Sequence, residues 1–175
     1  MTGNVTIADY NPQWPTRYEE ERRLILGAAG DVISAIEHIG STSVPGLAAK
    51  PIIDIMPGVR NLADADRCIE SLRGIGYEYV PEYEAEMPDR RYFRKGPPEA
   101  HYHMHMVEVG SDFWERHLLF RDALRSDTAL SGQYERLKRR LATELGADAR
   151  AYTEAKTPYI ESVVAKARAA NEGHR

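Results

Sequence analysis

The chain has 175 residues, of which 42% are hydrophobic and 29% charged, and its formal net charge at pH 7 is −4. This length and composition are typical of a soluble globular protein, and we expect residues 1–175 to form a single domain with a real core. The negative balance makes nucleic acid an unexpected partner, because nucleic-acid affinity comes mainly from Lys and Arg side chains that neutralise phosphates.

The N-terminal half predicts strands and helices in alternation. A helix is expected over residues 14–29, then strands over 32–39 and 52–56, with Pro57-Gly58 ending the second strand. A helix over 61–73, with Asn61 as N-cap, precedes a strand-like stretch over 77–83. Cys68 is alone and so forms no internal disulfide, which fits the cytoplasm. No apolar run approaches the roughly 20 residues of a membrane span, and no signal peptide is recognisable.

The C-terminal half continues this pattern and ends in helices. Strands are expected over residues 90–95 and 101–109, joined by a turn at 96–98. Helices follow over 113–125, 130–145 and 149–170, before a short tail at 171–175. In the first of these, Asp112 and Glu115 have the spacing of a capping box. The predicted fold class is therefore α+β: a mixed sheet of about five strands flanked by helices, with a motif core at 32–109 and a C-terminal helical portion at 111–170.

The segment between the first two strands carries the clearest chemical pattern, HIGSTSVPGLAAKPIIDI at residues 38–55. Gly40 allows a close backbone approach, and Ser41 and Thr42 offer hydroxyl and N–H groups to an anion. Asp54 is one charge within an apolar strand, which is costly unless it faces a cleft, a cation or a partner. Two plainer interpretations remain open, namely an ordinary surface loop and a salt-bridged structural acid. Lys50 is not a close neighbour of Asp54 along an extended strand.

A row of histidines marks the last strand. His101, His103 and His105 lie at alternate positions and so share one face of the strand. Imidazoles in this pattern suit metal binding, proton transfer or phosphate contact, and the alternative is a half-exposed polar face without a ligand. The basic run at 90–95 is either a solvated edge or a source of phosphate contacts through Arg91 or Arg94. The run of Lys and Arg at 138–140 is expected to be a solvated helix face.

These motifs resemble the signature of the GrpB family, a group within the nucleotidyltransferase superfamily whose domain is also found fused to dephospho-CoA kinase. The resemblance rests on the 38–55 block, on HYHMHMVEVGSDFWERHLLFRDALR at 101–125, and on a Tyr-Lys-Tyr pattern at Tyr152, Lys156 and Tyr159. It implies the polymerase-β-like fold. It also implies a phosphate-holding role for Lys156, because helical lysines at similar places in nucleotidyltransferases hold triphosphate.

The resemblance also identifies a departure from the superfamily pattern. Met56 stands where the second acid of an Asp-x-Asp pair would be, and the third acid position falls among histidines. Asp54, His103 and His105 thus look like an altered carboxylate triad and are the expected catalytic and metal-binding residues. Histidine favours softer metals than Mg²⁺, so Mg, Mn and Zn remain candidates for a divalent cofactor.

The expected function is a nucleotidyltransferase that takes a nucleoside triphosphate or related phosphoester and passes a nucleotidyl group to a small acceptor. The expected phosphate-binding residues are Gly40, Ser41, Thr42, Lys50, Arg91 and Lys156. Two alternatives stay open: a degenerate domain that binds a nucleotide or CoA-like ligand without catalysis, and a histidine-based metal-dependent hydrolase. The sequence leaves the acceptor, the base and the oligomeric state undetermined.

Overall fold

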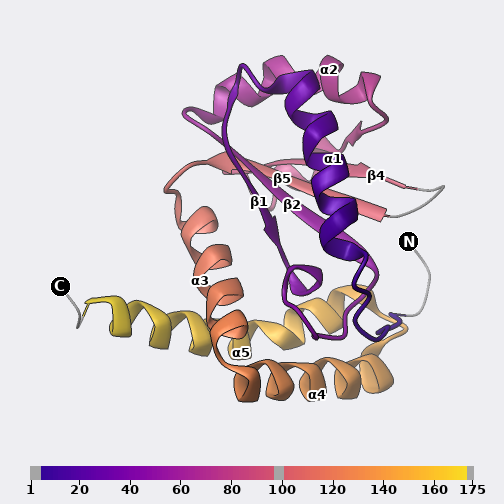
Figure 1. Cartoon of the computed structure of the whole chain (residues 1–175), viewed down its shortest axis with the longest axis vertical. Helices are drawn as coiled ribbons and strands as arrows, with labels where there is room; N and C mark the ends of the chain where they lie inside the picture. The colour runs from indigo at the N-terminus through magenta and orange to yellow at the C-terminus, as the bar shows by residue number, and fades with distance from the viewer. Residues whose placement is uncertain (1–4, 97–100, 173–175) are drawn as a thin grey trace.

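A five-stranded mixed sheet forms the centre of the computed structural model, which describes residues 5–96 and 101–172. The spatial order of its strands is β1-β2-β5-β4-β3, with β2 and β5 parallel and the other neighbours antiparallel (Figure 1). Their bounds are β1 Ile33–Ile39, β2 Ile52–Val59, β3 Glu78–Tyr79, β4 Arg91–Lys95 and β5 His101–Glu108. The expected fold class is confirmed.

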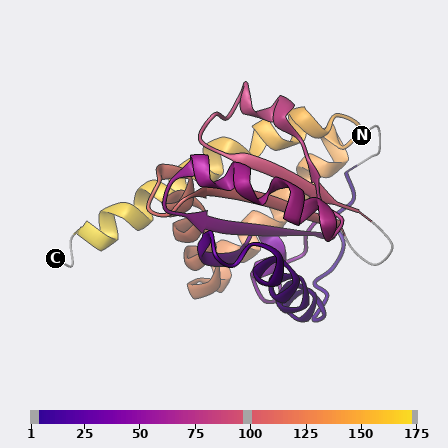
Figure 2. The same cartoon turned by 90° about the horizontal axis from the view of Figure 1, so that it is seen from above.

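Helices cover both faces of this sheet (Figures 1 and 2). On one face lie α1 (Trp14–Ala29), the 3₁₀ helix η2 (Leu62–Cys68) and α2 (Ile69–Gly74). The C-terminal helices α3 (Asp112–Ser126), α4 (Thr128–Leu145) and α5 (Ala149–Glu172) gather on the other side, and short 3₁₀ turns occur at η1 (Ser41–Ser43) and η3 (Pro81–Glu84). Within the described parts of the chain, no helix is both long enough and apolar enough to cross a membrane.

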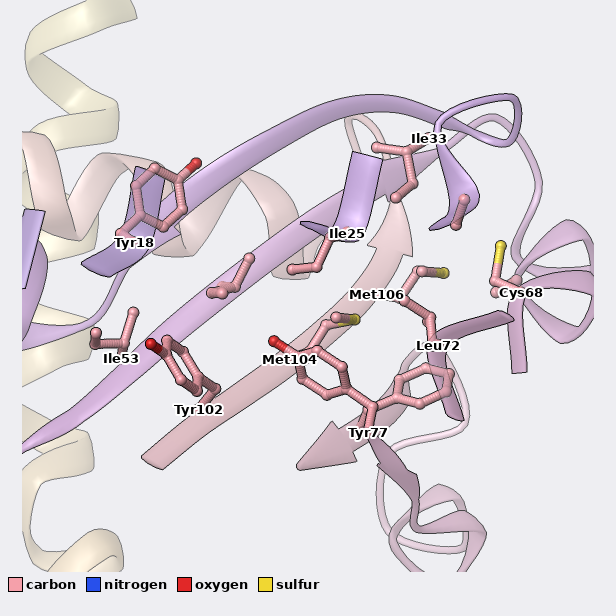
Figure 3. Packing of buried hydrophobic residues seen from close by; sticks show 14 of the residues in the cluster. Tyr18, Ile25, Ile33, Ile53, Cys68, Leu72, Tyr77, Tyr102, Met104 and Met106 are labelled. Carbon is pink, nitrogen blue, oxygen red and sulfur yellow. The ribbon is translucent and has the colours of Figure 1, made fainter. Parts of the chain in front are cut away.

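The main hydrophobic core lies between α1, α2 and the sheet (Figure 3). Side chains alternate along a strand, so Ile53 and Ile55 of β2 and Met104 of β5 all point into this layer. They meet Ile25 of α1 and Leu72 of α2, and each of these five side chains is at most 1% exposed. Burial of this kind stabilises a fold by about 25 cal/mol per Å² of apolar surface.

The opposite face of the sheet carries the polar residues of both motifs. Near its outer end, Met56 and Val107 pack against Trp114 of α3 in a second cluster. Asp54 precedes Met56 by two positions, so it shares this face of β2. The same alternation places the odd-numbered histidines of β5 here. This side of the sheet is therefore apolar under α3 and polar where α4 and α5 approach.

Two expected local features differ in the structure. Pro57 and Gly58 do not end β2, because they pair with Ile36 and Ala35 of β1 beside a register shift. Gly58 is needed inside the strand, since an added Cβ would lie 2.7 Å from Trp114 Cζ3. The stretch over 61–73 begins as a 3₁₀ helix, although Asn61 does cap it.

Two further boundaries were placed inexactly by the sequence. Ser111, and not Asp112, caps α3, because its side chain accepts a hydrogen bond from the Trp114 N–H. Only Glu78–Tyr79 of the strand expected over 77–83 pairs with β4. Much of the turn expected at 96–98 lies outside the described residues. The tail expected from residue 171 starts within α5, and its last three residues also fall outside that range.

Candidate functional site

The parallel pairing of β2 and β5 brings the acid and the histidines together. Asp54 is the register partner of His103. The Asp54 Oδ1 atom lies 3.8 Å from His103 Nδ1 and 3.5 Å from His105 Nε2. The Asp54 side chain is 27% exposed, so it is accessible but largely surrounded by protein. A carboxylate and two imidazoles that are 49 and more residues apart in sequence thus form one cluster.

Gly40 begins the loop above this cluster and touches the carboxylate. Its φ is 70° and its ψ is −178°, a combination that is essentially restricted to glycine. An added Cβ would lie 2.4 Å from Asp54 Oδ2. The glycine of the motif is therefore required both by its backbone conformation and by its contact with Asp54.

Thr42 and His38 fix this loop from below. The Thr42 hydroxyl donates to the Ile52 carbonyl at 3.1 Å, and its oxygen lies 3.0 Å from His38 Nε2. Since the hydroxyl has one proton, the His38 ring must donate through Nε2. His38 is 6% exposed and stacks on Tyr18. The Thr42 side chain is thus committed to holding the loop, and His38 has a structural role.

Three lysines converge on the space in front of Asp54. A pocket of about 280 Å³ contains Asp54 and His103 on its sheet side. It is lined by Ser41, Thr42, Ala49, Lys50, Ile52, Asp54, His103, Lys138, Tyr152, Thr153 and Lys156. Among the residues that the structure describes, none of these lysines forms an ion pair with a carboxylate. The pocket therefore holds a local excess of positive charge in a protein whose net charge is −4.

Burial strongly lowers the pKa values of two of these lysines. Lys138 of α4 is 2% exposed, donates from Nζ to the Ala48 carbonyl, and lies over the Tyr134 ring. Burial, reinforced by the charge of Lys156, lowers the pKa of Lys138 to about 7. Burial and the charge of Lys50 lower the pKa of Lys156 to about 8. An anion entering the pocket would stabilise the protonated form of both side chains.

Asp54 stays ionised in this setting. Burial on its own raises the pKa of the carboxyl, but the hydrogen bond and charge of His105, followed by His103 and His38, bring the pKa below its ordinary value. His105 is oriented in turn by Arg90, whose Nη1 lies 3.0 Å from His105 Nδ1. A guanidinium only donates, so Nδ1 accepts and the ring proton is on Nε2, facing Asp54.

The expected metal ligands do not make a complete site. Across 5–96 and 101–172, no three His, Cys, Asp or Glu side chains are arranged so that they could hold a metal ion. His105 offers no lone pair to the pocket, because Arg90 occupies Nδ1 and Nε2 carries the proton. Asp54 and His103 remain as the side chains that would hold an ion, and oxygens of a bound ligand would have to complete its coordination.

Arg91, one of the expected phosphate-binding residues, is not brought to the pocket, and Gly40 and His105 adjoin Asp54 without lining the pocket. Tyr92 of β4 contacts the rings of His103 and His105, so its neighbour Arg91 points to the opposite face of the sheet. There Arg91 forms ion pairs with Asp66 at 2.8 Å and Glu84 at 3.4 Å. These two acids balance the charge of Arg91 at that face. His101 is exposed at the start of β5 and does not line the pocket.

Sequence reasoning missed the burial of Lys138, and two arginines of α3 anchor the loop. Lys138 is not on a solvated face: it lies between Tyr134 and Leu141 at the spacing of the buried side of α4, and that spacing was the available signal. Arg125 donates two hydrogen bonds to the Ser43 carbonyl, at 3.0 and 2.8 Å. Arg121 donates to Glu37 and to the His38 carbonyl. Both arginines hold the loop in place from behind.

Acid should destabilise the protein earlier than its carboxylates alone would predict. Burial lowers the pKa values of His38, His103 and His117 to about 4. The unfolded chain takes up these protons near the ordinary pKa of 6.5, and the folded chain does not. The free energy of unfolding should therefore fall between pH 6.5 and 4, by up to about 1.4 kcal/mol per pH unit for each histidine.

Urea unfolding at a series of pH values measures this slope. In His38→Gln the side chain keeps an N–H donor for Thr42 and cannot titrate, so the slope should be shallower by about one proton. An unchanged slope in this variant would show that His38 takes up its proton at the same pH in the folded and the unfolded chain.

Comparison with solved structures defines the class of fold. The Cid1 poly(U) polymerase with Mg 3′-dATP bound superposes with a TM-score of 0.53 at 13% identity, over 78% of this chain and 43% of that one. Terminal uridylyl transferase 4 from Trypanosoma brucei with bound CTP gives a TM-score of 0.51 at 14% identity, over 80% of this chain and 47% of that one. The protein therefore has the nucleotidyltransferase fold.

The chain belongs to the GrpB family, whose model, described as GrpB protein, matches residues 4–166. The crystal structure of GrpB from Enterococcus faecalis has a TM-score of 0.83 at 35% identity, and the match covers 93% of this chain and 96% of that one. The resemblance found in the motifs is thus confirmed.

Two relatives show that the domain occurs within longer proteins. YqkA of Bacillus subtilis is 37% identical over 169 residues, and the match covers 97% of this chain and 49% of YqkA. A dephospho-CoA kinase of Mycolicibacterium paratuberculosis is 29% identical, over 93% of this chain and 46% of the kinase. The chain thus spans about half the length of each.

Proposed function

We propose that this protein is a nucleotidyltransferase-like enzyme that binds a nucleoside triphosphate, or a related phosphoester, in the lysine pocket and transfers a nucleotidyl group to a small acceptor. The observation that carries the proposal is the convergence of Lys50, Lys138 and Lys156 in front of Asp54. Three cations without carboxylate partners among the described residues suit the distributed charge of a triphosphate. The lone, buried Cys68 supports a place in the cytoplasm.

In this proposal each group of the pocket has a distinct role. The lysines and the Ser41 loop hold the phosphates, and a divalent ion that enters with the nucleotide and is held by Asp54 and His103 would neutralise phosphate charge. An acceptor hydroxyl attacks the α-phosphorus, the bond to the bridging oxygen breaks, and pyrophosphate leaves. The proton of the hydroxyl passes to the ionised Asp54 carboxylate. Fixed charges in a partly dehydrated pocket supply much of the stabilisation of the transition state.

One structural feature favours the non-catalytic alternative. Met56, at the position of the second acid, is fully buried against Ile39 and Trp114. The described lining of the pocket therefore has one carboxylate, whereas two-metal transfer relies on several. A domain that binds the nucleotide without transferring it is the second candidate function.

Removing Lys156 should weaken triphosphate binding. We expect Lys156→Gln to reduce the affinity for sodium tripolyphosphate and for ATP about tenfold or more, because a charge-assisted contact contributes about 1.5–3 kcal/mol. Isothermal titration calorimetry measures this. Lys166→Gln, an exposed position on the same helix, is the matched control and should bind like the wild type. Equal affinity in all three proteins would contradict the proposal.

The pH dependence of the same titration provides a second readout. Protonated lysines bind the anion, and the pKa values of Lys138 and Lys156 are lowered to about 7 and 8. The affinity should therefore fall as the pH rises from 7 to 9, well below the ordinary lysine pKa of 10.5. A flat profile over this interval would mean that neither lysine holds the phosphates.

Transfer is tested separately from binding. Each α-³²P-labelled nucleoside triphosphate is incubated with the small-molecule fraction of a bacterial extract and Mg²⁺, Mn²⁺ or Zn²⁺. A transferase moves the label to a new compound and releases one pyrophosphate per transfer. Binding without pyrophosphate release under every condition would favour the non-catalytic candidate.

A further inference from the structure

A second pocket lies on the other side of the Asp54 cluster. Its volume is about 430 Å³, and it is formed by the residue 86–90 loop, the start of η2 and the first turn of α3. Arg90 lines this second pocket, and Asp54 lines the lysine pocket. The chain of contacts Arg90–His105–Asp54, at 3.0 and 3.5 Å, joins the two. A ligand in the second pocket would thus lie close to Asp54 and His105. The phosphates are expected on the other side of these two residues.

Arg90 is the group in this pocket whose bonding is incomplete. Its Nε is buried and has no hydrogen-bond partner among the described residues. Within 5–96 and 101–172 no carboxylate pairs with this guanidinium, which lies 4.9 Å from the Tyr92 ring centroid and 5.9 Å from that of Phe113. Burial correspondingly lowers the pKa of Arg90. An oxyanion that binds to such a cation forms charge-assisted hydrogen bonds with it and stabilises its charge.

The acids around the pocket do not compete for Arg90. Glu108 accepts the Leu62 N–H, and Asp112 pairs with Arg168. Glu86 lies 3.9 Å from Arg150. Asp89 is exposed at the loop, where solvent and salt screen its charge. Arg116, the other arginine of the wall, lies 3.9 Å from Asp112. Arg90 therefore keeps no carboxylate partner among the described residues, although four acids line the pocket.

Apolar side chains form another part of the pocket wall, which also contains Ser111 and Arg116. Phe113 presents its ring, stacked on His117 at 3.9 Å between ring centroids, and Met87 is 45% exposed beside it. Leu62 and Pro88 complete this wall. A flat or apolar body fits against these side chains, with an acidic group directed towards Arg90.

We propose that this second pocket is the acceptor subsite, and that it takes a small molecule with a carboxylate or similar oxyanion on an aromatic or apolar body. This inference rests on the proposed function, because a transferase must hold its second substrate beside the nucleotide. The Arg90 guanidinium binds the oxyanion, and Phe113 packs against the body of the molecule. The body of the acceptor and the triphosphate then occupy neighbouring pockets, and the acceptor hydroxyl extends past His105 to the α-phosphorus in front of Asp54.

Sodium benzoate is the probe. Its binding is measured by ¹⁵N-resolved NMR of the whole chain. Benzoate should cause saturable shifts at amides of residues 86–90 and 111–116, and the neutral analogue benzamide should bind at least tenfold more weakly. Saturating tripolyphosphate should leave the benzoate affinity unchanged, because the pockets are separate. Arg90→Gln should lose tenfold or more in benzoate affinity, and Arg67→Gln, an exposed arginine on the opposite face, should lose none.

A second variant guards against disturbance of His105. Met87→Ala leaves the contacts of His105 with Arg90 and Phe113 in place and should weaken benzoate binding several-fold without changing tripolyphosphate binding. The proposal is overturned if benzoate does not saturate, binds Arg90→Gln as well as the wild type, or is displaced by tripolyphosphate. The two proposals fail separately: tripolyphosphate titration alone tests the lysine pocket, and benzoate titration alone tests the acceptor subsite.

Discussion

Asp54→Asn should remove the effect of a divalent metal on nucleotide affinity and reduce pyrophosphate release at least about 100-fold. The reason is the loss of the ionised Asp54 carboxylate, the one acid among the described residues that line the pocket, whose pKa the neighbouring histidines hold low against the effect of burial. Metal-free tripolyphosphate should bind as well as before or more tightly, since one negative charge is removed from among three lysines. Calorimetric titrations with and without Mg²⁺ and Mn²⁺ measure both changes.

The same variant also tests whether Asp54 is a structural acid. The amide oxygen of Asn still accepts from His105 Nε2, so the melting temperature should stay near that of the wild type or rise. A fall of several degrees would assign Asp54 to the stability of the fold instead. Asp31→Asn, an exposed acid in the turn before β1, is the control for the change in net charge and should leave the metal effect intact.

Gly40→Ala should damage both the fold and the pocket. The positive φ costs a non-glycine residue about 1–3 kcal/mol, and the new Cβ would lie 2.4 Å from Asp54 Oδ2. Together these effects should lower the free energy of unfolding by about 2–4 kcal/mol and the tripolyphosphate affinity by tenfold or more. Urea unfolding and calorimetry measure the two losses.

Gly46→Ala separates backbone strain from the contact with Asp54. Gly46 also has a positive φ, of 78°, but no atom lies within 4 Å of an added Cβ. This variant should lose about 1 kcal/mol of stability and keep its affinity for tripolyphosphate. If Gly40→Ala loses no more stability and no more tripolyphosphate affinity than Gly46→Ala, the close approach of Gly40 to the carboxylate contributes to neither.

The predicted strands and helices succeeded where the sequence pattern and the burial agreed. Residues 14–29 were expected as a helix and form α1, because the apolar side of that stretch meets the sheet. Pro57 and Gly58 were read as the end of a strand, yet β2 continues through them with neighbours on both sides. Local breaker signals report the intrinsic preference of the backbone, and tertiary pairing overrode it here.

The sequence by itself determined the motif residues, the shared face of the histidines and the family, since these depend on residue identity and on the period of a strand. Only the tertiary structure decided which distant residues share the pocket. It placed Lys138 beside Asp54 and turned Arg91 to the other face, because β4 and α4 are oriented by long-range packing. It also placed Arg90 against His105 Nδ1, which puts the ring proton on Nε2. That histidine therefore donates to Asp54 and offers no lone pair to a metal. The charge of a lysine or arginine does not show where in the fold it lies. Contacts with residues distant in sequence decide whether the side chain lines a site or lies at an edge of the sheet.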